Sequence, residues 1–132
     1  MRYKVFAAFI AMIVLAGCGN MRPVNGKVVF ADGATAVELS GHLIMLQSVE
    51  HKVGASGVIR ADGTFTLGTH TDSDGAMLGK HRVAITPPVR EINKPAPKII
   101  ISDRYGKFET SNLEVEIQSG TNLLVLTVDR LK

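Results

Sequence analysis

The sequence contains one cysteine, no tryptophan and few aromatic residues, which make up 5% of its 132 residues. A single cysteine excludes an intrachain disulfide framework and any metal site built from several cysteines. The formal net charge of +3 comes from 15 basic and 12 acidic residues, without the clustered lysine and arginine of a nucleic-acid-binding protein. We therefore expect no nucleic-acid partner. Hydrophobic residues make up 45% of the chain, which is enough for a folded core, and the length fits one domain.

The longest apolar run lies close to the amino terminus. Residues 5–16 contain no charge and no proline, and Arg2 and Lys4 precede them. This run is too short to cross the hydrocarbon core of a bilayer as a helix, which takes about 20 residues. A basic start followed by a short apolar run instead predicts a secretory signal peptide over residues 1–17.

The cysteine follows this apolar run directly. Residues 15–18, Leu-Ala-Gly-Cys, resemble the lipobox of bacterial lipoproteins. The resemblance implies cleavage before Cys18, transfer of a diacylglyceryl group to its thiol and acylation of the new amino group, as with palmitate. Several acyl chains make a stable membrane anchor. We therefore expect a lipid-anchored cell-envelope protein facing the periplasm or the exterior, with Cys18 and a short tether over residues 18–22.

In bacterial lipoproteins, the residue after the lipidated cysteine influences the membrane to which the protein is sorted. Position 19 is Gly19 and not aspartate. In lipoproteins of this kind the difference favours the outer membrane, if the cell has one. The membrane, reached through the lipid anchor, is thus the first expected partner.

Apolar and polar residues alternate through residues 23–132, which we take as one domain. The alternating segments are residues 26–30, 64–67, 82–86, 113–118 and 124–128, while residues 43–46 are apolar on both faces. Asp-Gly pairs at residues 32–33, 62–63 and 74–75 supply turns between such segments. The pattern predicts antiparallel strands with one buried face. We predict an all-β fold, a single Ig-like antiparallel β-sandwich of about seven strands.

Residues 87–98 break the alternation. They hold four of the five prolines, together with Arg90, Lys94 and Lys98. Proline cannot donate to a sheet ladder, so this segment predicts an extended excursion between two strands. A stiff solvated connector and a contact loop both fit its composition.

Several short motifs are shared with one family. Residues 24–28 followed by the turn at 31–33, the strand at 61–67 and the strand at 79–85 resemble carboxypeptidase regulatory-like domains. In that family an aromatic residue is usual at the position of His81. The resemblance implies a transthyretin-like sandwich of seven strands. It implies no activity, because this fold serves as an accessory or binding module in many settings.

A narrower resemblance covers the same stretch of chain. Small planctomycete-type lipoproteins with this domain share a lipobox and further short motifs in the same order. In this sequence those motifs are residues 74–79, Tyr105, residues 110–113 and residues 120–122. The chain is therefore similar to these lipoproteins from Pro23 to Leu131.

Enzymes that use related folds need residue sets that this chain does not have. Intradiol-type dioxygenases hold iron with two tyrosines and two histidines, whereas Tyr105 alone remains after signal cleavage. A zinc carboxypeptidase needs a histidine followed three residues later by glutamate, and none of the four histidines has one. The G-x-S-x-G elbow of the α/β-hydrolases is also missing. We expect a protein that is not an enzyme, with no catalytic residue and no cofactor.

The residues whose spacing comes closest to that of a metal site are His70, Asp72, Asp74 and His81. Histidine occupies the positions where a calcium loop needs its first ligand and its bidentate glutamate. Imidazole is better suited to zinc or copper. An Asp-rich turn with exposed histidines explains the same residues. We therefore predict no metal site and retain these four as weak candidates.

The leading functional prediction is a non-enzymatic binding or scaffolding module at the membrane surface. Its partner would be an envelope protein or a glycan. The alternative is a small carbohydrate- or peptide-binding module that uses residues 87–98. The lack of tryptophan weakens the carbohydrate version, because sugar sites favour stacking rings. A metal-binding protein or an enzyme is the third class.

Overall fold

The structure, a computed structural model, describes residues 21–131. This part of the chain is all-β, with nine strands, two short 3-10 helices and no α-helix. Seven strands have three or more residues: β2 (Val24–Phe30), β3 (Leu43–Ser48), β4 (Gly54–Val58), β5 (Thr64–Thr66), β7 (Gly79–Thr86), β8 (Leu113–Ile117) and β9 (Asn122–Val128). The others are β1 (Met21–Arg22) and β6 (Ala76–Met77), and the helices are η1 (Val37–Leu39) and η2 (Asp103–Gly106). The predicted all-β sandwich is confirmed.

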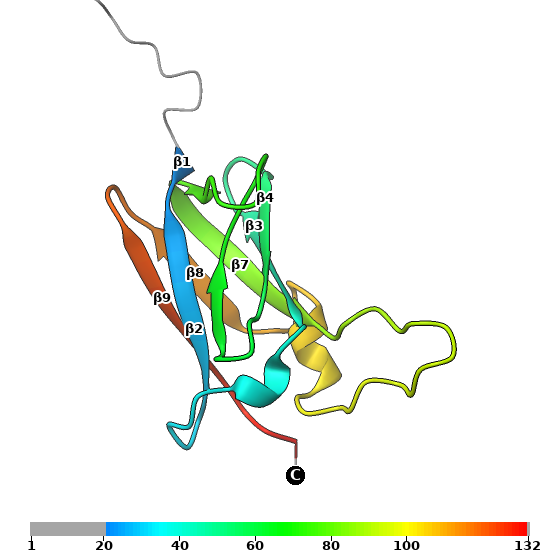
Figure 1. Ribbon diagram of the computed structural model, residues 1–132. Helices are drawn as coiled ribbons and strands as arrows, with labels where there is room; N and C mark the ends of the chain where they lie inside the picture. Colours follow the sequence, from blue (N-terminus) through cyan, green and yellow to red (C-terminus); the bar gives the residue numbers. More distant parts are fainter. Residues whose placement is uncertain (1–20, 132) are drawn as a thin grey trace, which may run out of the picture.

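Two larger sheets form the sandwich (Figure 1). One has the order β4-β3-β7-β8 and is antiparallel throughout. The other has the order β5-β2-β9, in which β2 and β5 are antiparallel but β2 and β9 run parallel, from Val24 opposite Asn122 to Phe30 opposite Val128. No hairpin joins β2 to β9, so no tight turn dictates an antiparallel pair. This parallel pair is the departure from the antiparallel arrangement that we expected.

The core lies between these two sheets and follows the alternation in the sequence. In β2, Val28 and Phe30 are buried while Lys27 is exposed. Facing strands contribute Ile44 of β3 and Ile85 of β7 to the same hydrophobic cluster. Burial of apolar surface of this kind stabilises the fold by about 25 cal/mol for each Å² removed from water.

Strand β4 was not predicted, because its sequence Gly-Ala-Ser-Gly-Val has no large apolar residues in alternation. The structure explains why small residues occupy it. Ser56 and Gly68 exchange two backbone hydrogen bonds, which join the middle of β4 to the chain just after β5. A Cβ added at Gly57 would lie 2.3 Å from the carbonyl oxygen of Thr66. The two sheets therefore approach each other here too closely for a side chain.

The two residues before Pro23, which we expected to lie in the tether, belong to a strand pair. Met21 and Arg22 form β1 and pair with Met77 and Ala76 of β6. The predicted signal peptide and Cys18 lie outside the described residues.

Candidate functional site

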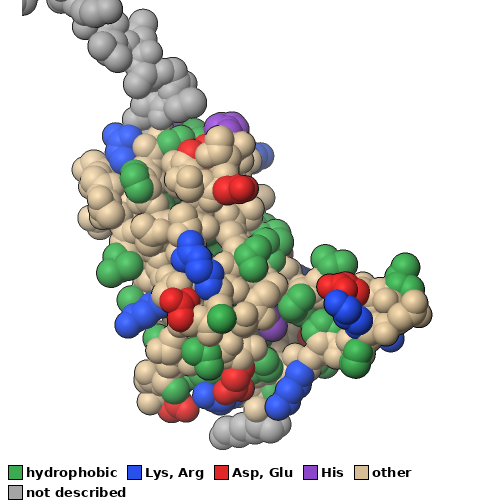
Figure 2. Space-filling view, viewed as in Figure 1, with side chains coloured by type: hydrophobic (Ala, Val, Ile, Leu, Met, Phe, Trp, Pro, Cys, Tyr) green, Lys and Arg blue, Asp and Glu red, His purple; other side chains and the backbone are tan. Residues whose placement is uncertain are grey.

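The proline-rich loop, residues 87–99, leaves the end of β7 and projects from the sandwich (Figure 1). As predicted, it contains no strand. Val89 and Ile92 are each 90% exposed, and hydrophobic and basic side chains lie together on this projection (Figure 2). Both apolar side chains are therefore in contact with solvent.

A cleft of about 320 Å³ lies where this loop meets the body of the domain. Its apolar wall consists of seven residues, Ile85, Pro87, Pro88, Pro97, Ile99, Ile100 and Ile101. Its polar residues are His42, Arg90, Lys98, Ser102 and Asp103. A mainly apolar cavity with a few polar groups is the usual form of a ligand site in proteins.

His42 lies in this cleft just before β3 and is 5% exposed. Its backbone N–H donates to the carbonyl of Leu39, and its own carbonyl accepts from Ile59 N. The side-chain Nδ1 is buried and has no hydrogen-bond partner. Burial lowers the pKa of His42, against an opposing effect from the backbone of Leu39 and Ser40, so the imidazole is neutral near pH 7.

Sequence reasoning missed His42. Nothing in the sequence distinguishes it from the exposed histidines, because the cleft that it lines also includes residues 97–103, which are distant in the chain. A buried polar atom without a partner is rare in folded proteins. His42 thus places one neutral polar side chain in the lining of a mainly apolar cleft.

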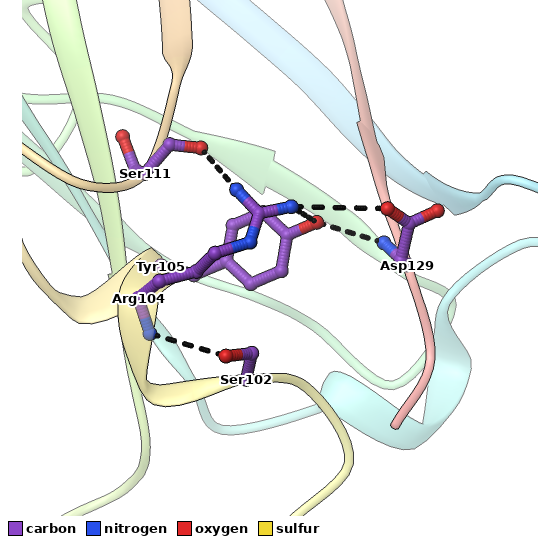
Figure 3. Close-up of polar contacts among 5 residues, drawn as sticks. All are labelled: Ser102, Arg104, Tyr105, Ser111 and Asp129. Atoms are coloured by element: carbon purple, nitrogen blue, oxygen red, sulfur yellow. Dashed lines mark hydrogen bonds and ion pairs between the residues drawn. The ribbon is translucent and has the colours of Figure 1, made fainter. Parts of the chain in front are cut away.

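A polar network holds η2, which forms one side of the cleft (Figure 3). Ser102 Oγ accepts from Arg104 N at 3.4 Å, and the Arg104 guanidinium donates to Ser111 O at 3.0 Å. The Tyr105 hydroxyl accepts from Arg104 Nη2 at 2.8 Å and from Asp129 N at 3.0 Å. These bonds join η2 to the end of β9, so that this wall of the cleft is fixed.

The predicted metal candidates lie partly in the turn between β5 and β6. The carboxylate of Asp74 accepts from the backbone N–H groups of Thr69 and His70, and these bonds, that of Thr69 foremost, lower its pKa. His70 and Asp72 are exposed. Asp74 thus stabilises the turn, as the sequence also suggested.

His81 does not join these residues. It lies on the core side of β7, opposite Ser48 of β3, and is 1% exposed. Its Nδ1 is 3.0 Å from the carbonyl of Gly79, and burial lowers its pKa. The expectation of an exposed histidine is therefore wrong at this position. Between residues 21 and 131 no three His, Cys, Asp or Glu side chains form a group that could hold a metal ion.

The cleft also bears on the carbohydrate alternative. Its lining residues include no phenylalanine and no tyrosine. Phe30 and Phe65 are buried in the core, so neither ring can stack on a sugar. The geometry therefore favours a ligand that offers apolar chains.

The chain was compared with protein-family models, with curated proteins and with solved structures, and none matches. Across residues 21–131, no helix has the length and apolar character to cross a membrane.

Proposed function

We propose that the chain is a lipid-anchored envelope protein whose carboxypeptidase regulatory-like domain serves as a non-enzymatic binding module. The observation that carries the proposal is Cys18, which directly follows an apolar run with Arg2 and Lys4 before it. A signal peptide and a lipidated cysteine account for all of these features together. The β-sandwich supports a binding role, because this architecture commonly presents loops to partners.

The arrangement of the domain is compatible with this role. Residues 19 and 20 alone separate Cys18 from β1, and an extended chain spans about 3.5 Å per residue. The β1 end would therefore lie close to the lipid surface. The proline-rich loop projects near the opposite end of the sandwich (Figure 1). An anchored domain would then present the cleft away from its own membrane.

Mass spectrometry of the amino-terminal peptide tests the anchor. In the chain purified from membranes, we expect a terminus at Cys18 with the mass of a diacylglyceryl group and a further acyl chain. Cys18→Ala should remove this mass and release the chain from the membrane fraction. Asn20→Ala is the matched control and should leave both unchanged. A mature chain with an unmodified Cys18 thiol would contradict the proposal.

A further inference from the structure

We infer that the cleft binds an extended acidic peptide, with an aliphatic side chain in the apolar cavity and carboxylates near Arg90 and Lys98. The inference rests on the proposed binding function and gives it a ligand class. It does not depend on the lipid anchor.

The size and chemistry of the cavity fit a side chain. A volume of about 320 Å³ corresponds to roughly ten water molecules at about 30 Å³ each. That space holds one or two aliphatic side chains, and not a folded element. The walls contributed by Ile85, Ile99 and three prolines offer such chains an apolar surface, without an aromatic face for a sugar ring.

The backbone of the proline-rich loop supplies the second observation. Residues 87–90 and 95–99 make no hydrogen bond with any other part of the described chain. Within the loop, the backbone bond is that from Lys94 N to Glu91 O. Four of these residues are prolines and have no backbone N–H to donate, so an extended peptide would pair mainly by donating its own N–H groups to carbonyl oxygens of the loop.

The charges on the loop indicate the sign of the peptide. Arg90 and Lys98 line the cleft and form no ion pair with any residue of the described chain, while Lys94 is paired with Glu91. Asp103 is the one acidic side chain in the cleft lining. The positive charge is therefore in excess, and an acidic peptide is attracted while a basic peptide is repelled.

His42 adds a polar group to an otherwise apolar cavity. Its Nδ1 lacks a hydrogen-bond partner, and its ring carries no charge near pH 7. The lining of the cleft is therefore not wholly apolar, and its polar side chains are compatible with a peptide ligand.

A fluorescence anisotropy titration tests the inference on the full chain purified from cells. If the chain carries lipid, it is studied in nanodiscs, and if it does not, the same titration is done in buffer. The probe is a labelled peptide that alternates glutamate with leucine and has blocked ends. The controls replace every glutamate by lysine, or every leucine by serine. We expect saturable binding of the glutamate–leucine peptide and at least about tenfold weaker binding of both controls.

Variants on the exposed loop locate the site without disturbing the core. Arg90→Glu combined with Lys98→Glu should weaken binding of the acidic peptide about tenfold or more and should favour the lysine control peptide. Lys27→Glu, on the opposite sheet, is the matched charge control. Ile99→Ser should also weaken binding, whereas Ile92→Ser, 90% exposed and outside the cleft lining, should not.

Several results would overturn the inference. They are equal binding of the glutamate and lysine peptides, no saturation at millimolar peptide, or unchanged affinity in the Arg90 and Lys98 double variant. Self-association of the chain that blocks the cleft, or binding of a neutral oligosaccharide there in place of the peptide, would also overturn it. Each of these outcomes leaves the lipidation test at Cys18 unaffected, so failure of the ligand class and failure of the anchor are distinguishable.

Discussion

At the scale of single residues, burial separates the four histidines into two groups. His42 and His81 are buried, and burial lowers the pKa of each. His51 and His70 are exposed. The buried pair must remain neutral inside the fold, whereas both residues are free to take up protons when the chain unfolds.

We predict that stability decreases as the pH falls below about 6.5, the ordinary histidine value. The pKa values of His42 and His81 are lower in the folded than in the unfolded chain, so the unfolded state binds more protons in this range. The free energy of unfolding therefore decreases as the pH is lowered. The loss levels off once the pH is below the folded values. Urea unfolding of His42→Gln at several pH values should show a shallower dependence than the parent chain. An unchanged slope in His42→Gln would contradict the prediction.

Tyr105 illustrates a residue whose hydroxyl has a structural role. We predict that Tyr105→Phe lowers the free energy of unfolding by about 1–2 kcal/mol, because Arg104 and Asp129 N lose their shared acceptor. Thermal or urea unfolding measures the change. Thr127→Val, at an exposed position on β9, should alter stability by less than about 0.5 kcal/mol. A Tyr105→Phe chain as stable as the parent would show that the two hydrogen bonds of this hydroxyl, drawn in Figure 3, contribute nothing to stability.

At the scale of elements, the close approach of β4 to β5 joins the edges of the two sheets. Gly57 faces the carbonyl of Thr66, and Ser56 is bonded to Gly68. A residue without a side chain is thus required at Gly57 by the neighbouring backbone.

Gly57→Ala should destabilise the domain by about 1–3 kcal/mol, because the new Cβ overlaps a backbone oxygen that cannot move alone. Gly54→Ala is the matched control in the same strand. Its Cβ would lie 3.4 Å from the nearest atom, Leu46 O, and should change stability by less than about 0.5 kcal/mol. Chemical unfolding of both variants measures the difference, and equal effects would refute the steric explanation.

The elements also show how far the sequence could be interpreted. Alternating apolar residues predicted β2, β7, β8 and β9, because each buries one face. Strand β4 was not predicted, because its small residues show no alternation of large apolar and polar side chains. The parallel partner of β2 was also not predictable, because alternation determines which face is buried and not which strand lies alongside.

At the scale of the whole molecule, the core and the proline-rich loop are separate parts. The core cluster contains no residue of the loop, and the loop residues 89–96 are all exposed. The domain therefore combines a rigid sandwich with a projection that contributes little to its stability.

Shortening the loop tests this separation. Replacing residues 89–96 by a Gly-Ser linker of about four residues should change the free energy of unfolding by less than about 0.5 kcal/mol, because a shorter loop costs little to close. The same variant should lose binding of the acidic peptide, since Arg90 is removed. Urea unfolding and the anisotropy titration provide the two measurements. A large loss of stability would show that the loop supports the core.

The sequence by itself determined the all-β class, the buried faces of the main strands and the place of the proline-rich excursion, because these depend on local periodicity and on proline. It also carried the prediction of a lipid anchor at Cys18, which lies before the described residues. Tertiary structure alone decided that β2 and β9 are parallel, that His81 enters the core and that His42 lies in a cleft beside Arg90 and Lys98. Those features join residues far apart in the chain, and their energies arise only when distant segments pack together.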